Sequence, residues 1–238
     1  MLIVLCRRWL WGAGLVCCVV LGMAGILWAG HRVEDAPAFA AQGETMVTVI
    51  VDPGHGGVDG GASTADGVLE RDLNLEVAQR VRDLLCLTGQ RAVLTRTTEE
   101  DLHTEGDTIR ERKVSDIRNR VALVNGTENG LLLSIHQNNF TDGRYSGAQV
   151  FYAGTEGSAQ LAKLLQEQLV SALNPGSNRK CKKSDGVYLM EHIDCTGVLI
   201  ECGFLSNVEE EAKLSCGTYQ KKLCCVIAAT VSQYLSNT

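Results

Sequence analysis

The segment from Val47 to Gly57, VTVIVDPGHGG, constrains the fold more than any other part of the chain. Its β-branched run is typical of a buried strand. The run ends at Asp52-Pro53-Gly54, where proline fixes φ and glycine accepts a positive φ in a turn. His55 follows directly and has only glycine neighbours, which leaves its imidazole open to a metal or a substrate. Open α/β sheets bind ligands at this place, beyond the carboxyl ends of their strands.

Strand-like and helix-like segments alternate along the rest of the chain. Apolar residues at helical spacing predict helices near 73–85, 114–124, 161–173 and 219–235, and short apolar runs predict strands at 91–96, 131–136, 147–152 and 198–202. Residues 187–190 indicate a further short strand, and Ser206 is expected to cap a helix together with Glu209. We therefore expect an α/β domain with a mostly parallel, twisted sheet of about six strands, flanked by helices on both faces.

Residues 9–30 are uncharged and mostly apolar, and Arg7 and Arg8 precede them. About 22 helical residues span roughly 33 Å, enough to cross a bilayer, and the positive charges favour a cytoplasmic stub at 1–8. We expect an N-terminal transmembrane helix, a linker at 31–45 and an exported domain at 46–238. The alternative is a signal sequence cleaved near Ala40, because Ala38-Phe39-Ala40 resembles a signal-peptidase site. Both interpretations place the domain outside the cytoplasm.

The net charge and the number of cysteines exclude some classes of protein. The formal net charge is −6, and the first 32 residues carry three arginines and no acid, so the exported part is more acidic still. Such a domain is a poor partner for nucleic acid, whose phosphates need clustered Lys and Arg.

Seven of the ten cysteines lie beyond the apolar segment, and Cys224 and Cys225 are adjacent. The odd number favours free, structural thiols over disulfides, which an exported protein is also able to form.

Four residues stand at one predicted edge of the sheet. His55 follows the first strand, His136 ends the strand LLLSIH, and Glu201 lies near the end of VLIEC. Glu70 opens the helix after the glycine-rich loop at 56–67. Two histidines and a carboxylate form a known catalytic zinc set that leaves a fourth position for water. A second carboxylate beside the metal is placed to take a proton from that water. Each residue alone also fits a structural role, whereas the combination points to a metal-dependent hydrolase.

At this point the sequence resembles a known family, the zinc-dependent N-acetylmuramoyl-L-alanine amidases of bacterial cell walls. The likeness covers residues 46–238. The matching segments are DPGHGG at 52–57, LERDLNLEVA at 69–78, LTR at 94–96, IRNRVALVN at 117–125, SIHQN at 134–138 and LIECGFLSN at 199–207. The resemblance implies that His55, Glu70 and His136 bind one Zn²⁺ and that Glu201 is the catalytic carboxylate. It also implies that the substrate is peptidoglycan, cut between N-acetylmuramic acid and L-alanine.

Other segments look closest to the spore-cortex, germination-specific branch of that family. They are RERK at 110–113, SGAQVFYAG at 146–154 and GVYLME at 186–191. Enzymes of this branch remove the peptide from muramic acid so that muramic-δ-lactam forms in the cortex. The resemblance therefore implies a sporulation protein held at a membrane by its N-terminal helix, outside the cytoplasm or in the forespore intermembrane space. An accessory activating protein fits this picture, although no residue pattern identifies one.

Five further residues are candidates for supporting roles. Asp52 and Asn138 stand next to the histidine motifs and are expected to orient the ligands, with a turn cap as the alternative for Asp52. Arg96, and on the next helix Arg118 and Arg120, are candidates to meet peptide carboxylates; surface salt bridges are the alternative for the last two. Vegetative wall turnover, a zinc carboxypeptidase acting on stem peptides, and a wall-binding module without catalysis remain the competing functions.

Overall fold

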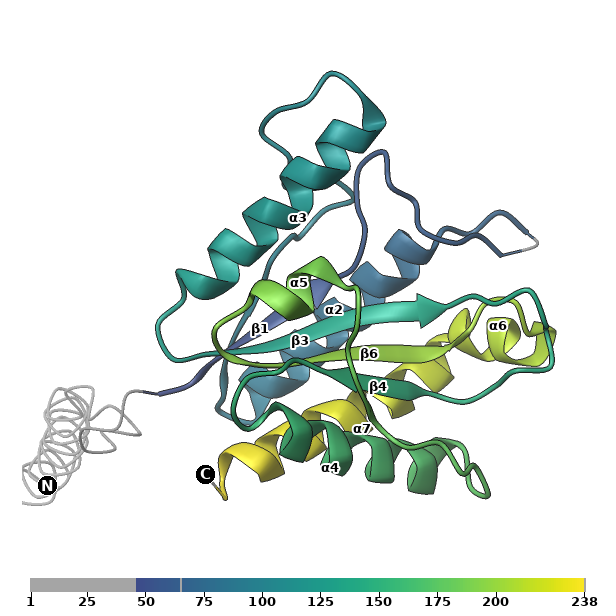
Figure 1. Cartoon of the computed structure of the whole chain (residues 1–238). Coiled ribbons are helices and arrows are strands. Elements are labelled where there is room, and N and C mark those ends of the chain that lie inside the picture. Colours follow the sequence, from purple (N-terminus) through teal and green to yellow (C-terminus); the bar gives the residue numbers. More distant parts are fainter. Residues whose placement is uncertain (1–45, 65, 238) are drawn as a thin grey trace, which may run out of the picture. The chain divides into compact units, whose positions relative to one another are not determined.

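The computed structural model describes residues 46–64 and 66–237, which form one compact α/β unit (Figure 1). Its six-stranded sheet has the order β2-β1-β3-β6-β4-β5. The strands are β1 (Thr48–Pro53), β2 (Arg91–Leu94), β3 (Gly130–Asn138), β4 (Gln149–Tyr152), β5 (Lys182–Lys183) and β6 (Thr196–Phe204). The predicted α/β class and number of strands are confirmed. The expected transmembrane helix at 9–30 lies outside the described residues, and within them no helix is long and apolar enough to cross a bilayer.

Helices cover both faces of the sheet, as expected from the alternation of elements. One face packs against α2 (Glu70–Leu87), α4 (Ser158–Leu173) and α7 (Gly217–Leu235), which share its larger apolar core. The opposite face holds a smaller core with α3 (Ile109–Asn125) and α5 (Tyr188–His192). The short α6 (Val208–Leu214) follows β6 at the end of the sheet (Figure 1).

The strand directions gather the predicted site residues at one edge. β1, β2, β3 and β6 are all parallel, whereas β4 runs antiparallel to β6 and pairs with β5 in parallel. The carboxyl ends of β1, β3 and β6 therefore meet at one edge, and α2 begins there because it follows β1. On β3 and β6, His136 lies directly opposite Glu201 in the strand register. The two side chains thus share one face of the sheet.

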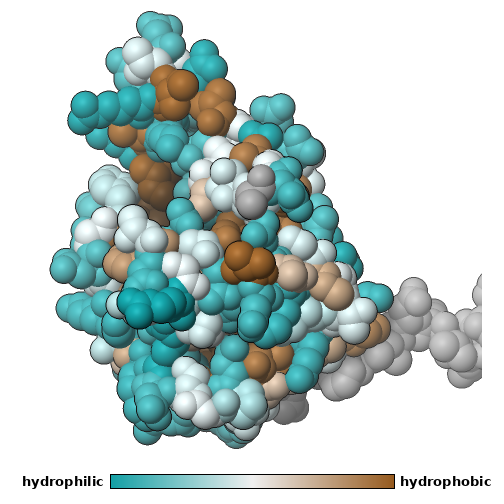
Figure 2. All heavy atoms as spheres, turned by 90° about the vertical axis from the view of Figure 1, so that its right-hand side faces the viewer, coloured by the Kyte–Doolittle hydropathy of each residue, from teal (hydrophilic) through white to brown (hydrophobic). Residues whose placement is uncertain are grey.

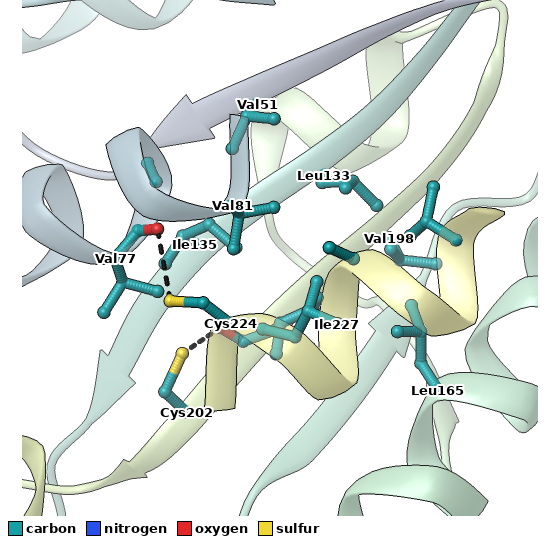
Figure 3. Close-up of a cluster of buried hydrophobic side chains, with 14 of the residues drawn as sticks. Val51, Val77, Val81, Leu133, Ile135, Leu165, Val198, Cys202, Cys224 and Ile227 are labelled. Carbon is teal, nitrogen blue, oxygen red and sulfur yellow. Dashed lines mark hydrogen bonds between the residues drawn. The ribbon is translucent and has the colours of Figure 1, made fainter. Parts of the chain in front are cut away.

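The larger core also accounts for two of the cysteines. Cys202 of β6 and Cys224 of α7 are buried among apolar side chains that include Val77 and Ile227 (Figure 3). The Cys224 thiol donates a hydrogen bond to the carbonyl of Val77 at 3.6 Å. Burial raises the pKa of both thiols, that of Cys224 to about 12, so both stay protonated and unreactive. All seven cysteines of the described residues are free, as expected, and the expected structural role fits Cys202 and Cys224, which are buried, whereas Cys86, Cys216 and Cys225 are exposed.

Two local predictions are wrong. Residues 187–190 are not a strand but open the helix α5, because Leu189, Met190 and Ile193 lie at helical spacing and pack into the smaller core. The cap of α6 is Asn207, not Ser206. The Asn207 side chain accepts hydrogen bonds from the backbone N–H groups of Glu209 and Glu210, whereas Ser206 accepts one from Phe140.

Candidate metal centre

Three side chains predicted as metal ligands converge at the carboxyl edge of the sheet. Their candidate ligand atoms all lie within 4.8 Å of one another. Glu70 Oε1 is 3.2 Å from His55 Nε2 and 3.1 Å from His136 Nδ1. Figure 2 looks onto this edge, where a mostly hydrophilic surface is interrupted by small apolar groups and α3, with the loop before it, projects at the top. Two histidines and a carboxylate at this spacing are a donor set suited to zinc.

His55 adopts an unusual backbone conformation, with a φ of 63°. A residue other than glycine is held there only where the surroundings over-determine its conformation. Here Arg96 Nε donates to the carbonyls of Pro53 and His55 at 3.0 and 2.8 Å, and its Nη2 donates to that of Gly54 at 3.0 Å. Arg120 adds bonds to the carbonyls of Pro53 and His55 at 2.8 and 2.6 Å. Two buried guanidinium groups therefore fix the segment that presents the His55 imidazole.

Asp52 holds Arg120 in this position through a buried ion pair. It is 1% exposed, and its carboxylate accepts hydrogen bonds from Arg120 at 2.6 Å, Thr95 at 2.6 Å and Ser134 at 2.8 Å. Burial alone would raise the pKa of Asp52, but the charge of Arg120 and the two hydroxyl donors hold it below its usual range. Asp52 is thus neither a turn cap nor a direct partner of a histidine in the described structure. It orients the site through Arg120.

The placement of Arg96 does not fit the expectation that it meets a substrate carboxylate. Its side chain is buried and donates to five backbone carbonyls, those of Pro53, Gly54, His55, Arg71 and Thr98. Arg120 is likewise buried rather than part of a surface salt bridge, while Arg118 is exposed on the same helix. The guanidinium of Arg96 therefore supports the loop, because four of its five N–H groups are used by backbone carbonyls.

The Glu70 carboxylate is held in place by several donors. Its Oε2 accepts from the backbone N–H of Ala62 at 2.9 Å, and its Oε1 accepts from that of Gln137 at 3.1 Å. The amide of Asn74, one turn along α2, donates to Oε1 at 3.3 Å. Burial opposes ionisation, but the bonds to His136 and His55 outweigh it and hold the pKa of Glu70 well below its ordinary value. Glu70 is therefore an ionised, pre-oriented ligand candidate.

Asp59 joins the site although the sequence analysis did not single it out. Its Oδ2 lies 3.0 Å from His55 Nδ1, on the side of the ring opposite to the nitrogen that faces Glu70. A carboxylate behind a histidine fixes the ring and its tautomer in many metal sites. Burial lowers the pKa of His55, but bonds to Asp59 and Glu70 raise it to about 9. The contact between Asp59 and His55 could not be predicted from the sequence, because it depends on the conformation of the glycine-rich loop and loops have no periodic pattern.

Two glycines let the backbone approach the site closely. A Cβ on Gly54 would overlap the imidazole of His136, and one on Gly61, whose φ is +66°, would fall 2.8 Å from His55 Cδ2. These positions require glycine for space, and Gly61 also for its backbone conformation. The glycine-rich loop thus serves as a wall of the centre.

Glu201 lies beside the three candidate ligands and has no such support. It faces His136 across the strand pair, and its Oε2 is buried without a hydrogen-bond partner among the described residues. Burial raises the pKa of Glu201 to about 7. A buried polar atom without a partner is costly unless a ligand or water meets it. This orphaned carboxylate next to a His-Glu-His set fits a metal with a bound water.

Asn138 lies outside this cluster. It ends β3 opposite Phe204 and, in the described part of the chain, its amide makes no hydrogen bond to His55, Glu70 or His136. Its side chain instead lines a neighbouring depression of the surface. The expectation that Asn138 orients a ligand is therefore not supported by this geometry.

The fold and the site define an α/β protein with a candidate metal centre of two histidines and a glutamate at the carboxyl edge of its sheet. The model of the N-acetylmuramoyl-L-alanine amidase family matches residues 49–233. The chain belongs to this family, and it is an amidase that acts on peptidoglycan.

Two relatives and two solved structures illustrate the similarity. The chain is 41% identical over 190 residues to the germination-specific N-acetylmuramoyl-L-alanine amidase of Bacillus subtilis, covering 79% of each chain. It is 31% identical to LytC of the same organism, covering 79% of this chain and 35% of LytC. The CwlD amidase of Clostridioides difficile, solved in complex with the GerS lipoprotein, is 36% identical with a TM-score of 0.77, covering 81% of this chain and 100% of CwlD. A second amidase, from Clostridium difficile 630, is 28% identical with a TM-score of 0.71, covering 82% and 100%.

These similarities confirm the predicted family and its germination-specific branch. They favour the amidase over the carboxypeptidase and over a wall-binding module without catalysis. The amide bond hydrolysed by an amidase of this name joins N-acetylmuramic acid to L-alanine.

Proposed function

We propose that the chain hydrolyses this amide with one zinc ion held by His55, Glu70 and His136, and with Glu201 as the catalytic carboxylate. The observation that carries the proposal is the convergence of the three ligand atoms within 4.8 Å, next to a buried Glu201 oxygen without a partner. When bound, zinc supplies a Lewis acid that lowers the pKa of water to roughly 7 and polarises a carbonyl.

The residues of the protein have separate roles in this reaction. Glu201 Oε2 accepts the proton of the attacking water and passes it to the leaving nitrogen of L-alanine, which balances the hydrolysis. Asp59 keeps the proton of His55 on Nδ1, so that Nε2 is free to bind the metal. Arg96 and Arg120 hold the backbone that presents His55. The backbone N–H groups of Ala62 and Gln137 keep the Glu70 carboxylate oriented.

The test is digestion of purified peptidoglycan by the zinc-loaded full chain, with the products identified by mass spectrometry. We expect release of peptides with L-alanine at the new amino terminus. Glu201→Gln is the matched control, because it keeps the size of the side chain and removes the base; loss of a general base costs about 10²–10⁴-fold in rate. Substantial activity of Glu201→Gln, with zinc still bound, would refute the assigned role of Glu201.

The biological role we propose is maturation of the spore cortex, where removal of the peptide allows muramic-δ-lactam to form. It is supported by the 41% identity to a germination-specific amidase. Vegetative wall turnover is the alternative role. Muropeptide analysis of spores from cells that lack the chain separates the two, since only the cortex role predicts loss of muramic-δ-lactam. Complementation with Glu201→Gln should fail to restore it.

We also propose an exported location and an accessory partner. The apolar residues 9–30 support a membrane anchor, with a secreted form after cleavage near Ala40 as the alternative. The related CwlD of Clostridioides difficile was solved in complex with the GerS lipoprotein, which supports a lipoprotein partner for this chain. Fractionation of cells and the mass of the mature chain test the first point. Co-purification from sporulating cells, with the enriched proteins identified by mass spectrometry, tests the second.

A further inference from the structure

An aromatic depression lies next to the candidate metal centre and has no part in the mechanism above. It has a volume of about 280 Å³ and is lined by Phe140, Tyr145, Phe151, Phe204, Arg179 and Lys182; we call it the aromatic trough. Residues 46–238 contain three phenylalanines, and all three line this trough. Phenylalanine normally fills cores. Phe204 is buried and Phe151 is half-buried against the smaller core, whereas Phe140 and Tyr145 are exposed. The trough therefore offers exposed aromatic surface to a ligand.

The aromatic side chains of the trough are packed against one another. Phe140 and Tyr145 meet edge to face at 5.1 Å, and Tyr145 stacks on Phe204 at 6.2 Å. Phe140 is nevertheless 51% exposed, and other lining residues shield Phe204 from solvent. Exposed aromatic rings held in a fixed arrangement are pre-organised for binding, since little side-chain entropy remains to be lost.

The trough also carries positive charge that the protein does not neutralise. Arg179 lies over the ring of Phe204 at 4.8 Å, and its Nε and Nη1 donate to Ser146 and Gln149. Among the described residues, nothing accepts a hydrogen bond from Arg179 Nη2, and no carboxylate lies within ion-pair distance of Arg179 or Lys182. In an acidic protein these are unpaired cations, held at the wall of a groove. Their natural complement is a carboxylate.

The trough is continuous with the site of cleavage. Gln149, which lines it, is the direct strand partner of Glu201. Asn138 and Phe204, at the ends of β3 and β6, lie two and three residues beyond His136 and Glu201 on the same strands. A substrate whose scissile amide sits at Glu201 therefore extends into the trough on one side of that bond.

We propose that the aromatic trough binds the peptide side of the substrate and that Arg179 and Lys182 pair with its carboxylates. This inference rests on the proposed amidase function. The lactyl carboxyl group of muramic acid is consumed in the scissile amide, so the glycan chain on that side of the bond is neutral. The substrate's free carboxylates lie on the stem peptide, and the unpaired cations select that side.

The test is a binding measurement that needs no turnover. Isothermal titration calorimetry with the zinc-loaded full chain compares L-alanyl-γ-D-glutamyl-L-lysine with the same tripeptide whose glutamyl α-carboxylate is a carboxamide. Neither contains the muramoyl bond. We expect the acid to bind about tenfold more tightly than the amide, as a charge-assisted hydrogen bond typically contributes. The preference should shrink in higher salt.

Three variants test which residues cause the preference for the acid over the carboxamide. Arg179→Gln and Lys182→Gln should each bring the two dissociation constants closer together, with little change for the carboxamide. The side chain of Lys182 is exposed and makes no hydrogen bond in the described structure, so the Lys182→Gln variant tests the proposal even if Arg179→Gln is unstable. Lys221→Gln, an exposed site on α7 across the sheet, removes the same charge and should change neither constant. The neutral disaccharide N,N′-diacetylchitobiose tests the glycan as an alternative occupant.

Equal binding of acid and amide by the unmodified chain would overturn the proposal. So would binding of the disaccharide that is weakened by Lys182→Gln. A preference for the acid together with no release of peptides from peptidoglycan would contradict the proposed function but not the binding of the acid in the trough, because binding and turnover are measured separately.

Discussion

Replacing Arg120 by methionine tests whether the buried guanidinium holds the candidate metal centre together. Arg120 is 2% exposed and pairs with Asp52, which is 1% exposed, at 2.6 Å. Methionine fills much of the same volume but leaves the Asp52 carboxylate buried, with only the hydroxyls of Thr95 and Ser134 as donors. The variant therefore removes one charge of a buried pair and strands the other.

The expected loss of stability follows from this pairing. Removing one partner of a buried ion pair costs about 3–5 kcal/mol. The carbonyls of Pro53 and His55 keep their bonds to Arg96, so they add little to this figure. For a domain of this size, about 1 kcal/mol corresponds to roughly 2–4 °C, which gives a fall in Tm of about 6–20 °C. Zinc affinity should fall as well, about 10–100-fold, because His55 loses part of its support.

Chemical denaturation and zinc titration of the full chain measure both effects. Arg118→Met is the matched control, since Arg118 lies two residues away on the same helix and is exposed; it should change stability by less than about 0.5 kcal/mol. In an Arg120→Met background, Asp52→Asn should restore part of the lost stability because it removes the stranded charge. A loss below about 1 kcal/mol for Arg120→Met, or equal losses at the two arginines, would refute the reasoning.

Three further predictions concern the same surroundings. Asp59→Ala should lower zinc affinity about 10–100-fold with little change in Tm, measured by competition with a chelator; unchanged affinity would remove Asp59 from the site. The pKa of Asp52 is below its unfolded value of about 3.9, so its contribution is present above that pH and is lost as pH falls further. The stability gap between the unmodified chain and Asp52→Asn should narrow below about pH 4, and a constant gap would contradict this. Gly61→Ala should reduce zinc binding, since its Cβ would fall against His55 and Glu70; full occupancy, measured by metal analysis, would show that the loop adapts.

Most residues of this site could be predicted from the sequence, because the geometry of parallel strands fixes where their ends and side chains lie. A strand that ends in a turn places the next side chain at the sheet edge, and parallel strands share that edge. That reasoning located His55, His136 and Glu201, and it placed Glu70 at the same edge because Glu70 opens the helix that follows the first strand. The face of each residue followed from alternation along its strand.

The supporting contacts were not accessible in the same way. Arg96 and Arg120 bond to the carbonyls of Pro53 and His55, which lie 41 to 67 residues away in sequence, and Asp59 contacts His55 only because the loop folds back. The side chain of an arginine in a helix or loop carries no periodic signal that says which carbonyl it meets. The misassigned strand at 187–190 has a related cause, because a short apolar run does not distinguish a strand from one turn of helix.

Glu201 leads to a last prediction that links stability to catalysis. Its Oε2 is buried without a partner in the described structure, and burial raises its pKa to about 7, above the unfolded value of about 4.3. A carboxyl group with a raised folded pKa destabilises the fold where it is forced to ionise, at high pH, and has no such effect below its unfolded pKa.

The zinc-free Glu201→Gln chain should therefore be more stable than the unmodified chain at pH 8, by about 1–3 kcal/mol, the usual cost of a buried group without a partner. The difference should disappear as pH falls towards about 4, where both side chains are neutral. Urea denaturation in the presence of a chelator at several pH values measures it. If Glu201→Gln were less stable than the unmodified chain at every pH, Glu201 would have a structural partner. The idea that the fold loses stability in order to keep an unpartnered catalytic base would then be wrong.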